Sequence, residues 1–436
     1  MAVALAEGRS DPLPREPVPA SPPTAARRSP VPRVLPPLPK LTAPPETEII
    51  DIRSSHASLL DNLDTKILDG LTQLPGQKSL PSLLIWDEKG QMLYDDILVA
   101  EDYYPYRIEN ELLKENVDGM ARSIAAPRPD LLVELGAGNM SKTARLLSSL
   151  DRYLDSTLIY YALDVDRARL EKSLFMLKDR TTLRWIKIYG LLGTYDEGAA
   201  WLSRAEAIPY RKALLWLGSS IANFEQHEAS KLLASFAKHP ETGELQNLVG
   251  LLVLTDGCQD GTAIERAYNI SSGESRRWLT YAIEAARRHL RCSGDSDEVD
   301  RLLADGNWKF EGQWHPERQR YQNYLVPTRQ LVGRIQGHPI HIEEGERVTL
   351  LHSGKWTKGT LSRVGREAGL DVGRSWHNAE FDYGMILGSL PRGSSFADAF
   401  TGAYWLQPSV DWPDSGTDIL ETPESSEYEG QIKASL

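Results

Sequence analysis

Cysteine is almost absent from the sequence, with only Cys258 and Cys292 among 436 residues. Two cysteines cannot build a disulfide framework or a cysteine-rich zinc site, so we expect a reducing, cytoplasmic setting and no bound metal. No apolar run approaches the roughly 20 residues that a membrane-spanning helix needs. The N-terminus also lacks the basic-then-apolar pattern of a secretory signal. The sequence therefore predicts no membrane association.

An excess of positive charge is also missing. The formal net charge is -12 at pH 7, which argues against a general nucleic-acid binder, because such a protein needs a basic face to neutralise phosphates. The 41% of hydrophobic and 25% of charged residues are typical of a folded globular protein. The length allows two domains, or one domain with a large insertion.

Proline is unevenly distributed. Residues 1–45 hold 13 of the 27 prolines, and such a segment can neither form a hydrogen-bond ladder nor bury a core. We predict a disordered Pro-rich arm there, with a docking tail for a proline-recognising domain as the functional alternative. The acidic stretch at 393–436, rich in Ser, Gly and Pro, is predicted to be a largely disordered tail.

The chain is organised around residues 131–147. The apolar run from Leu131 to Leu135 includes Glu134 and is followed by Gly136 and Gly138, and residues 140–147 have helical spacing of apolar residues. Strand, glycine turn and helix are typical of a nucleotide-cofactor site. The third glycine of the dinucleotide fingerprint is missing, and no Gly-Lys-Ser/Thr follows. An adenosyl ligand without phosphates suits this turn better, although an ordinary strand–turn–helix explains the glycines equally well.

Further strands alternate with helices along the next hundred residues. Apolar strands are predicted at 158–166, 183–189, 213–217 and 251–256, and helices at 169–180, 199–207 and 227–238. This alternation predicts a parallel α/β sheet whose ligand lies at the carboxyl ends of the strands. Asp164 ends the second strand, where an acid can bind the two hydroxyls of a ribose. Tyr195 and the loop 218–223 follow later strands at the same edge.

The pattern changes after Asp256. Helices are predicted at 263–268 and 275–289, and period-two alternation predicts antiparallel strands at 308–314 and 321–326, continued at 340–342 and 348–352. A helix at 359–368 and a late strand at 379–387 return to the first sheet. At the other end of the chain, a strand at 49–52 and a helix at 58–74 precede a tyrosine-rich stretch, 94–106. That stretch has neither a helix face nor a strand face and forms either a pocket wall or a packed lid.

The glycine turn, the ribose acid and the polar-aromatic stretch together fit S-adenosylmethionine as cofactor. Its sulfonium makes the methyl carbon electrophilic without a metal, so a protein mainly has to hold an amine lone pair in line with the S–CH3 bond. The amine must also be neutral. Tyrosines and amides can bind the free base and still accept its hydrogen bonds.

Several strings resemble the family of histidine-specific and dimethylallyltryptophan N-methyltransferases, within the class I S-adenosylmethionine enzymes. They include Tyr-Tyr-Pro-Tyr-Arg-Ile-Glu at 103–109, Val-Glu-Leu-Gly-Ala-Gly at 133–138, Ala-Leu-Asp-Val at 162–165, Leu-Gly-Ser-Ser-Ile-Ala-Asn-Phe at 217–224, Ala-Tyr-Asn at 267–269, Trp-His-Pro-Glu-Arg at 314–318 and Ser-Gly-Lys-Trp at 353–356. They cover residues 48–390 in the family's order. The first and fourth strings are specific, whereas the glycine turn is not.

The resemblance implies a Rossmann-like class I methyltransferase sheet with an inserted α+β substrate-binding domain. The implied divisions are 46–108 for the N-terminal part of the substrate-binding region, 109–257 for the cofactor domain, 258–356 for the insertion and 357–392 for the return to the cofactor domain. The implied cofactor-binding residues are Arg107, Glu134, Gly136, Gly138, Lys142, Asp164, Tyr195, Gly218 and Ser219. The implied substrate-binding residues are Tyr94, Tyr104, Asn223, Tyr268, Leu351 and Ser353, of which Tyr94, Tyr104 and Asn223 are also placed at the chemistry.

One position departs from the family pattern. The histidine-specific members carry a glutamate two residues before the serine of the last motif, and that glutamate holds the imidazole; here Leu351 precedes Ser353. A leucine cannot accept a hydrogen bond from an imidazole N–H, so discrimination for histidine is lost. The resemblance therefore implies a pocket for an apolar or aromatic amino acid.

These observations give one leading hypothesis and its alternatives. We expect an S-adenosylmethionine-dependent N-methyltransferase, monomeric or homodimeric, that methylates the α-amine of an aromatic amino acid such as 4-dimethylallyl-L-tryptophan in fungal secondary metabolism. Histidine Nα-methylation, as in ergothioneine formation, is the second enzymatic reading. A non-catalytic cofactor-binding scaffold is a third. A nucleotide-dependent oxidoreductase is disfavoured, because the glycine fingerprint is incomplete.

Overall fold

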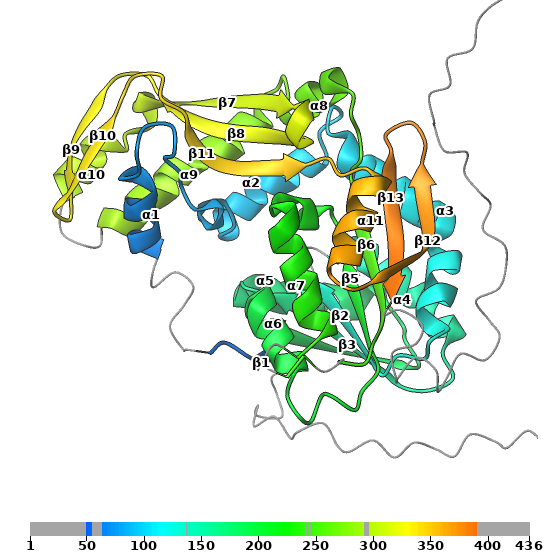
Figure 1. Ribbon diagram of the computed structural model, residues 1–436. Helices are drawn as coiled ribbons and strands as arrows, with labels where there is room; N and C mark the ends of the chain where they lie inside the picture. The colour runs from blue at the N-terminus through cyan, green and yellow to red at the C-terminus, as the bar shows by residue number, and fades with distance from the viewer. Residues whose placement is uncertain are drawn as a thin grey trace, which may run out of the picture. The chain divides into compact units, whose positions relative to one another are not determined.

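The computed structural model of the protein describes residues 49–54, 63–136, 138, 140–239, 242–243, 246–291 and 296–389, which all belong to one compact unit, Pro37–Leu436 (Figure 1). The predicted Pro-rich arm at 1–45 and the predicted tail at 393–436 lie outside the described residues. None of the described helices combines the length and the apolar character needed to cross a membrane.

The main sheet has eight strands in the order β1-β4-β3-β2-β5-β6-β13-β12. Neighbours from β1 to β6 are parallel, whereas β13 runs antiparallel to both β6 and β12. The strands are β1 (Ile49–Asp51), β2 (Leu131–Leu135), β3 (Leu158–Asp164), β4 (Ile186–Leu192), β5 (Lys212–Trp216), β6 (Leu248–Thr255), β12 (Asp371–Asn378) and β13 (Tyr383–Ser389). This order confirms the predicted Rossmann-like α/β sheet.

Helices pack on both faces of this sheet (Figure 1). They are α3 (Tyr104–Ala125), α4 (Ser141–Leu150), α5 (Arg167–Arg180), α6 (Tyr195–Leu202), α7 (Gln226–Ala237) and α11 (Lys358–Glu367). Helix α4 contacts α3 and α5, whereas α7 contacts α6 and α11. The chain runs from β2 through β3 to β4 in one direction and from β5 to β6 in the other. Right-handed crossovers therefore place the two groups on opposite faces.

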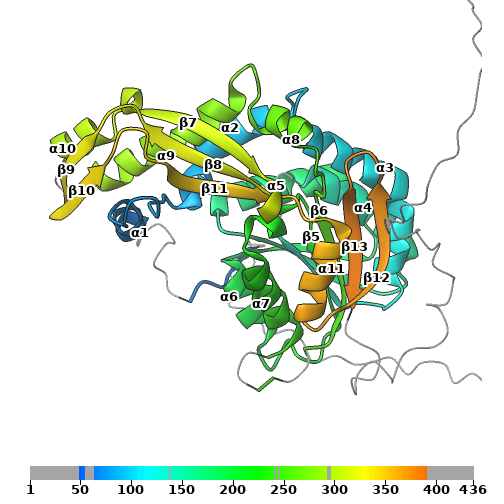
Figure 2. The ribbon, with the colours of Figure 1, turned by 45° about the horizontal axis from the view of Figure 1, so that its top comes forward.

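The chain leaves the main sheet after β6 and returns at α11. The inserted elements are α8 (Gly261–Tyr268), α9 (Glu274–Arg291), α10 (Ser296–Leu302), β7 (Trp308–His315), β8 (Arg320–Pro327), β9 (Leu331–Ile335), β10 (His338–Ile342) and β11 (Val348–Gly354). Strands β11-β8-β7 form an antiparallel sheet, and β9 pairs with β10 in a separate hairpin. Helices α8 and α9 pack on β7 and β8 (Figure 2). The predicted α+β insertion is confirmed.

The N-terminal segment is divided between the two parts. Helix α1 (Leu63–Leu71), the 3-10 helix η1 (Ser82–Ile85) and α2 (Glu88–Leu98) pack on α9. In contrast, β1 pairs with β4 at the edge of the main sheet, where Ile49 and Ile50 are buried. Residues 46–108 were expected to belong together to the substrate-binding region. The strand is separated from it because an apolar segment can extend an open parallel sheet edge.

Two local expectations differ from the structure. The tyrosine-rich stretch was expected to have no helix face, but Tyr94 lies on α2 and Tyr104 begins α3. The Asp87 carboxylate caps α2 by accepting from the Gly90 amide at 2.8 Å, and Pro105 is tolerated in the first turn of α3, where no intrahelical N–H is needed. Strand β12 was not predicted, because Asp371–Asn378 is polar and lies at the edge of the sheet.

Candidate active site

The cofactor crevice, defined here by the loops after β2 and β5, lies where the strand order reverses. In an open α/β sheet this is the point where neighbouring loops separate and leave room for a ligand. The backbone there has positive φ at Gly136 (+72°), Gly138 (+57°) and Gly218 (+77°). Glycine adopts these angles without the steric cost that a Cβ brings. The local sequence thus forms open turns at the strand ends.

Gly136 also makes a close contact that no larger residue allows. A Cβ at this position would lie 2.7 Å from the Tyr195 hydroxyl. Tyr195 begins α6 after β4, and its ring contacts Trp216 and Phe224. Burial and then the nearby Asp164 carboxylate raise the pKa of Tyr195 to about 12, so the phenol stays protonated at neutral pH. The turn is a cradle that a side chain would fill.

Asp164 is the last residue of β3, one strand away from the glycine turn. Burial raises the pKa of its carboxyl, opposed by the nearby Arg169. One carboxylate oxygen accepts from the Asp166 amide at 3.2 Å. The side chain is half-buried, and a carboxylate at this strand end can accept from both hydroxyls of a ribose. The cradle and this acid fit an adenosyl cofactor.

Glu134 lies one residue before the end of β2 but is enclosed by protein. Its carboxylate accepts from Thr143 Oγ1 at 2.8 Å and from Tyr160 Oη at 2.5 Å. Burial raises the pKa of Glu134 to about 7, opposed by those two hydrogen bonds. The side chain therefore connects β2 with α4 and β3. It holds the strand end and the helix that enclose the glycine turn.

Lys142 was expected at the cofactor, and the structure pairs it with Glu109. Their side chains meet at 2.5 Å, and the other oxygen of Glu109 accepts from the Gly218 amide at 2.9 Å. Glu109 on α3 is 2% exposed. One buried carboxylate thus joins α3, the first turn of α4 and the loop after β5. Lys142 Nζ still lies 3.8 Å from the place a Gly218 Cβ would take, so it borders the crevice.

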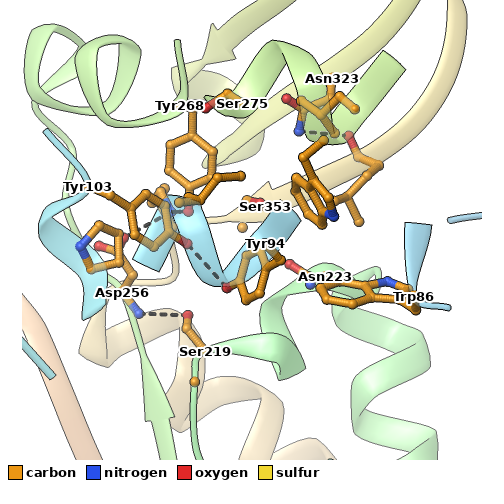
Figure 3. Close-up of a pocket in the computed structure, with 18 residues that line it drawn as sticks. Trp86, Tyr94, Tyr103, Ser219, Asn223, Asp256, Tyr268, Ser275, Asn323 and Ser353 are labelled. Carbon is orange, nitrogen blue, oxygen red and sulfur yellow. Dashed lines mark hydrogen bonds and ion pairs between the residues drawn. The ribbon is translucent and has the colours of Figure 1, made fainter. Parts of the chain in front are cut away.

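A pocket opens next to the crevice, where the main sheet meets the insertion (Figure 3). Gly218 and Ser219 of the loop after β5 belong to its lining, so the two spaces adjoin. The lining residues are Trp86, Tyr94, Ile97, Tyr103, Pro105, Gly218, Ser219, Asn223, Asp256, Tyr268, Ser275, Trp278, Leu279, Asn323, Leu351, Ser353, Gly354 and Lys355. They come from α2, α3, η3 (Ser220–Asn223), α8, α9, β8 and β11, together with the loops between them.

One side of the pocket is an aromatic cluster formed by Trp86, Tyr94 and Trp278. The Trp86 ring centroid lies 5.3 Å from both other rings, and the Tyr94 and Trp278 centroids are 4.9 Å apart. Such edge and tilted packings are favourable for aromatic rings. Burial raises the pKa of Tyr94 to about 12, and its hydroxyl lies 3.5 Å from that of Tyr103. Both phenols are neutral at physiological pH, because the pKa of Tyr103 is also raised by burial.

A buried ion pair forms the floor of the pocket. Lys355 Nζ lies 2.9 Å from Asp256 Oδ2, and both side chains are 1% exposed. The carboxylate also accepts from Tyr104 Oη at 2.9 Å and from the Cys258 amide at 3.0 Å. Burial alone would lower the pKa of Lys355, but the Asp256 carboxylate and then Tyr268 raise it. The lysine is therefore charged, and the acid is fully paired.

The same lysine orients Tyr268, which was predicted from the sequence as a carboxylate-binding residue. Lys355 Nζ donates to the Tyr268 hydroxyl oxygen at 2.7 Å. An ammonium group can only donate, so the phenol oxygen accepts and its own proton points elsewhere. The Tyr268 ring also packs edge-on against Tyr103, with centroids 5.8 Å apart. The arrangement leaves one O–H donor for a ligand.

The structure brings together Tyr94, Gly218, Ser219, Asn223, Tyr268, Leu351 and Ser353 in the pocket lining. Within the described part of the chain, neither the Asn223 amide nor the Ser353 hydroxyl has a hydrogen-bond partner. Tyr104 does not belong to the pocket lining. Its ring stacks on Phe381, and its hydroxyl donates to the Asp256 carboxylate of the lining. Arg107 is exposed and pairs with Glu111 at 3.4 Å, one turn further along α3. The structure thus places Arg107 outside the pocket lining.

Sequence reasoning did not single out Trp86, Trp278, Asn323, Asp256 or Lys355. The sequence did mark two of them. Asp256 directly follows the apolar residues of β6, much as Asp164 ends β3, and Lys355 lies inside the string 353–356 that resembles the family. The tryptophans and Asn323 come from elements that only the tertiary fold brings together. Among the described residues, no cluster of three or more His, Cys, Asp or Glu is placed to hold a metal ion.

Comparison with known proteins gives a family and several relatives. The histidine-specific, S-adenosylmethionine-dependent methyltransferase family matches residues 63–389. N-methyltransferase imqF of Aspergillus flavus is 34% identical over 80% of this chain and 90% of its own length. Ergothioneine biosynthesis protein 1 of Neurospora crassa is 31% identical over 78% of this chain, but that match spans only 36% of its length. The 4-dimethylallyltryptophan N-methyltransferase easF of Claviceps purpurea is 29% identical over 78% of this chain and 97% of its own length.

Proposed function

Because the chain belongs to the histidine-specific, S-adenosylmethionine-dependent methyltransferase family, we propose that it methylates the α-amine of an aromatic amino acid. It is an S-adenosylmethionine-dependent N-methyltransferase with a small-molecule substrate. The proposed substrate is 4-dimethylallyl-L-tryptophan or a related tryptophan derivative of secondary metabolism. The observation that carries this proposal is the pocket side formed by Leu351 and the aromatic cluster Trp86, Tyr94 and Trp278.

The cofactor crevice supplies binding and orientation. S-adenosylmethionine, when bound, supplies an electrophilic methyl group on a sulfonium, so no metal is needed for the transfer. The glycine turn at Gly136 and Gly138 would let the protein backbone approach the cofactor closely, and Asp164 would accept from its ribose hydroxyls. Since the crevice and the pocket share Gly218 and Ser219, the amine can be held beside the reactive carbon. Proximity and orientation are worth several orders of magnitude in rate.

The pocket favours a neutral amine. A free carboxylate beside the amine would stabilise the ammonium form, which has no lone pair for attack. The acid in the lining, Asp256, is already paired with Lys355, Tyr104 and a backbone amide. The phenols of Tyr94 and Tyr103 are neutral. A neutral amine would keep the lone pair that methyl transfer from S-adenosylmethionine needs, and the proton of the methylated amine would leave to solvent.

The α-carboxylate is proposed to bind at Tyr268 and Asn223. Lys355 donates to the Tyr268 oxygen, so the phenol proton is available to the carboxylate. The Asn223 amide can donate to the carboxylate and accept from the amine, since it has no partner in the described residues. Tyr268 lies beside the ion pair Asp256–Lys355, whose positive member also favours an anion.

The side chain of the substrate is proposed to lie against Leu351 and the aromatic cluster. Contact with Leu351 and stacking with Trp86 and Trp278 favour a large aromatic ring over the smaller imidazole. The name of the relative easF supports this reading, because it specifies a prenylated tryptophan. Histidine remains an outcome of the test, since the relative from Neurospora crassa is named for ergothioneine formation.

Mass spectrometry of reactions with tryptophan, 4-dimethylallyltryptophan, tyrosine, phenylalanine and histidine tests the proposal. We expect the gain of one or more methyl groups on an aromatic amino acid, with fragmentation placing them on the α-nitrogen. Methylation of histidine alone, or of none of the five, would contradict it.

A substitution of Tyr268 tests its proposed role in binding the α-carboxylate of the substrate. Tyr268→Phe removes a hydrogen bond to a charged group, worth about 1.5–3 kcal/mol, so kcat/KM should fall roughly tenfold to a hundredfold through KM. Affinity for S-adenosylhomocysteine should not change. Tyr324→Phe, at a tyrosine of β8 outside the pocket lining, is the matched control. An equal loss in both variants would remove the special role of Tyr268.

A further inference from the structure

Asn323 and Leu351 face each other across the antiparallel pair β8–β11. The register is Thr349 opposite Tyr324 and then Leu351 opposite Asn323, so one residue, Leu350, is bulged out. Directly opposed residues of an antiparallel pair project to the same face of the sheet. Asn323 and Leu351 both line the pocket, next to Trp278 of α9. The bulge therefore presents an amide beside the leucine that departs from the family pattern.

The orientation of the Asn323 amide is set by the backbone. Its Nδ2 donates to the Leu351 carbonyl oxygen at 3.2 Å (Figure 3). A carbonyl only accepts, so the nitrogen must face it and the Oδ1 atom must face the other way. Asn323 is 2% exposed, and its Oδ1 is buried with no hydrogen-bond partner among the described residues. The pocket thus contains one fixed acceptor without a donor.

An unpaired buried carbonyl is unfavourable, and buried polar groups in proteins are nearly always paired. At a binding site, the missing partner can be supplied by the ligand. Among the apolar side chains of the lining, Leu351 and Leu279 have no donor, and Trp278 already donates its indole N–H to the Ile85 carbonyl at 3.3 Å. Asn323 Oδ1, on the lining residue opposite Leu351, therefore receives no hydrogen bond from these side chains.

We propose that Asn323 Oδ1 accepts a hydrogen bond from a donor on the substrate's aromatic ring, an indole N–H or a phenol O–H. This inference rests on the proposed function and adds the chemistry of the side chain that the pocket selects. A site built to pair a ring donor rejects the analogue that lacks it, because the acceptor is then left buried and unpaired. Asn323 is a specificity-determining residue, separate from the groups that hold the amine and the carboxylate.

Two substrate pairs test this with the wild-type protein. Tryptophan is compared with its benzothiophene analogue, in which sulfur replaces the ring N–H, and tyrosine is compared with phenylalanine. We expect kcat/KM to be roughly tenfold to a hundredfold higher for the donor-bearing member of the pair that the pocket accepts. The indole pair and the phenol pair show which donor the pocket takes. Equal kcat/KM within both pairs would overturn the inference.

Asn323→Leu removes the acceptor at similar volume. A substrate without a ring donor then leaves no buried acceptor unpaired, so the kcat/KM ratio within the pair should fall to about threefold or less. Binding of S-adenosylhomocysteine should be unchanged. Gln322→Leu is the matched control, because Gln322 donates to the same Leu351 carbonyl but does not line the pocket. It should keep the wild-type preference. A preference retained in Asn323→Leu would overturn the assignment, and the wild-type ratios decide the question if that variant does not fold. Absence of any methylated amino acid would instead contradict the proposed function.

Discussion

At the scale of single residues, Glu109 shows how one buried side chain positions several parts of the site. Its two oxygens hold Lys142 of α4 and the Gly218 amide after β5, while its own backbone belongs to α3. Because a buried carboxylate is costly unless it is paired, the three segments cannot separate easily. Glu109 closes the string 103–109 in the sequence, so its presence was visible, but its two partners were not.

Glu134 gives a prediction about stability and pH. Burial raises the pKa of Glu134 to about 7 in the folded state. The folded protein therefore holds a proton that the unfolded chain releases at an ordinary glutamate pKa. This contribution is fully present below that ordinary pKa and is lost as the pH rises through about 7, by at most ~1.4 kcal/mol for each unit of difference.

The variant Glu134→Gln should consequently show a flatter dependence of the free energy of unfolding on pH. Urea denaturation at acidic and at mildly alkaline pH measures it, with exposed Glu115→Gln on α3 as the control. A wild-type slope that persists in Glu134→Gln would show that other groups cause it.

The site residues divide by what the sequence could predict. Asn223, Tyr268 and Ser353 lie in strings that resemble a family, Tyr94 was inferred from the same resemblance, and Leu351 was noted as a departure from it. The structure brings all five into one lining. The partners of those residues could not be read in the same way. Lys355 approaches Asp256 only because the insertion begins and ends beside β6, where Thr255 Oγ1 also donates to the Trp356 carbonyl at 3.1 Å.

At the scale of elements, the glycine turn after β2 allows a matched comparison. Gly136→Ala and Gly76→Ala both place a Cβ on a residue with φ between +70° and +80°, which costs roughly 1–2 kcal/mol. Only the Cβ at Gly136 would meet a neighbour, the Tyr195 hydroxyl, whereas the one at Gly76 meets nothing within 4 Å.

We expect both variants to lose stability, Gly136→Ala the more because of its contact with Tyr195, and at least a tenfold loss of S-adenosylhomocysteine affinity in Gly136→Ala alone. Calorimetric titration measures the affinity and thermal unfolding the stability. Unchanged affinity in Gly136→Ala would place the cofactor away from this turn.

The strands of the main sheet were predictable where both of their faces are buried. All five residues of β2 and of β5 are buried, so their sequences are apolar apart from Glu134 and Lys212. Strand β12 follows the opposite case. It lies at the edge, is mostly exposed or half-exposed, and carries Asp371, Arg374 and His377, so no apolar pattern marks it. Pairing with β13, rather than the local sequence, makes this segment a strand.

At the scale of the whole molecule, the pocket depends on an insertion that leaves and rejoins the main sheet at one place. Asp256 follows β6 at the exit, and Lys355 follows β11 at the return. Their ion pair joins the two ends, and the lining residues come from both parts. Sequence periodicity predicted that an α+β insertion exists, but it could not predict which of its faces turns toward the crevice.

The N-terminus supplies a prediction at the same scale. Removal of residues 1–45 should leave the melting temperature and the cofactor affinity unchanged, because the sequence of that segment cannot bury a core. Removal of residues 1–54 also deletes β1, whose Ile49 and Ile50 are buried, together with the buried Ile52 that follows it. Each buried isoleucine contributes roughly 1.5–3 kcal/mol, so the second truncation should be much less stable. Equal stability of the two truncations would show that β1 is dispensable.

The most direct test of the central claim is a competition between an aromatic amino acid and histidine for the same enzyme. With equimolar 4-dimethylallyltryptophan and histidine, the ratio of α-N-methylated products measured by mass spectrometry equals the ratio of the two kcat/KM values. The pocket formed by Leu351, Trp86 and Trp278 predicts that the aromatic product exceeds the histidine product by at least about tenfold. A histidine product in excess would contradict the account.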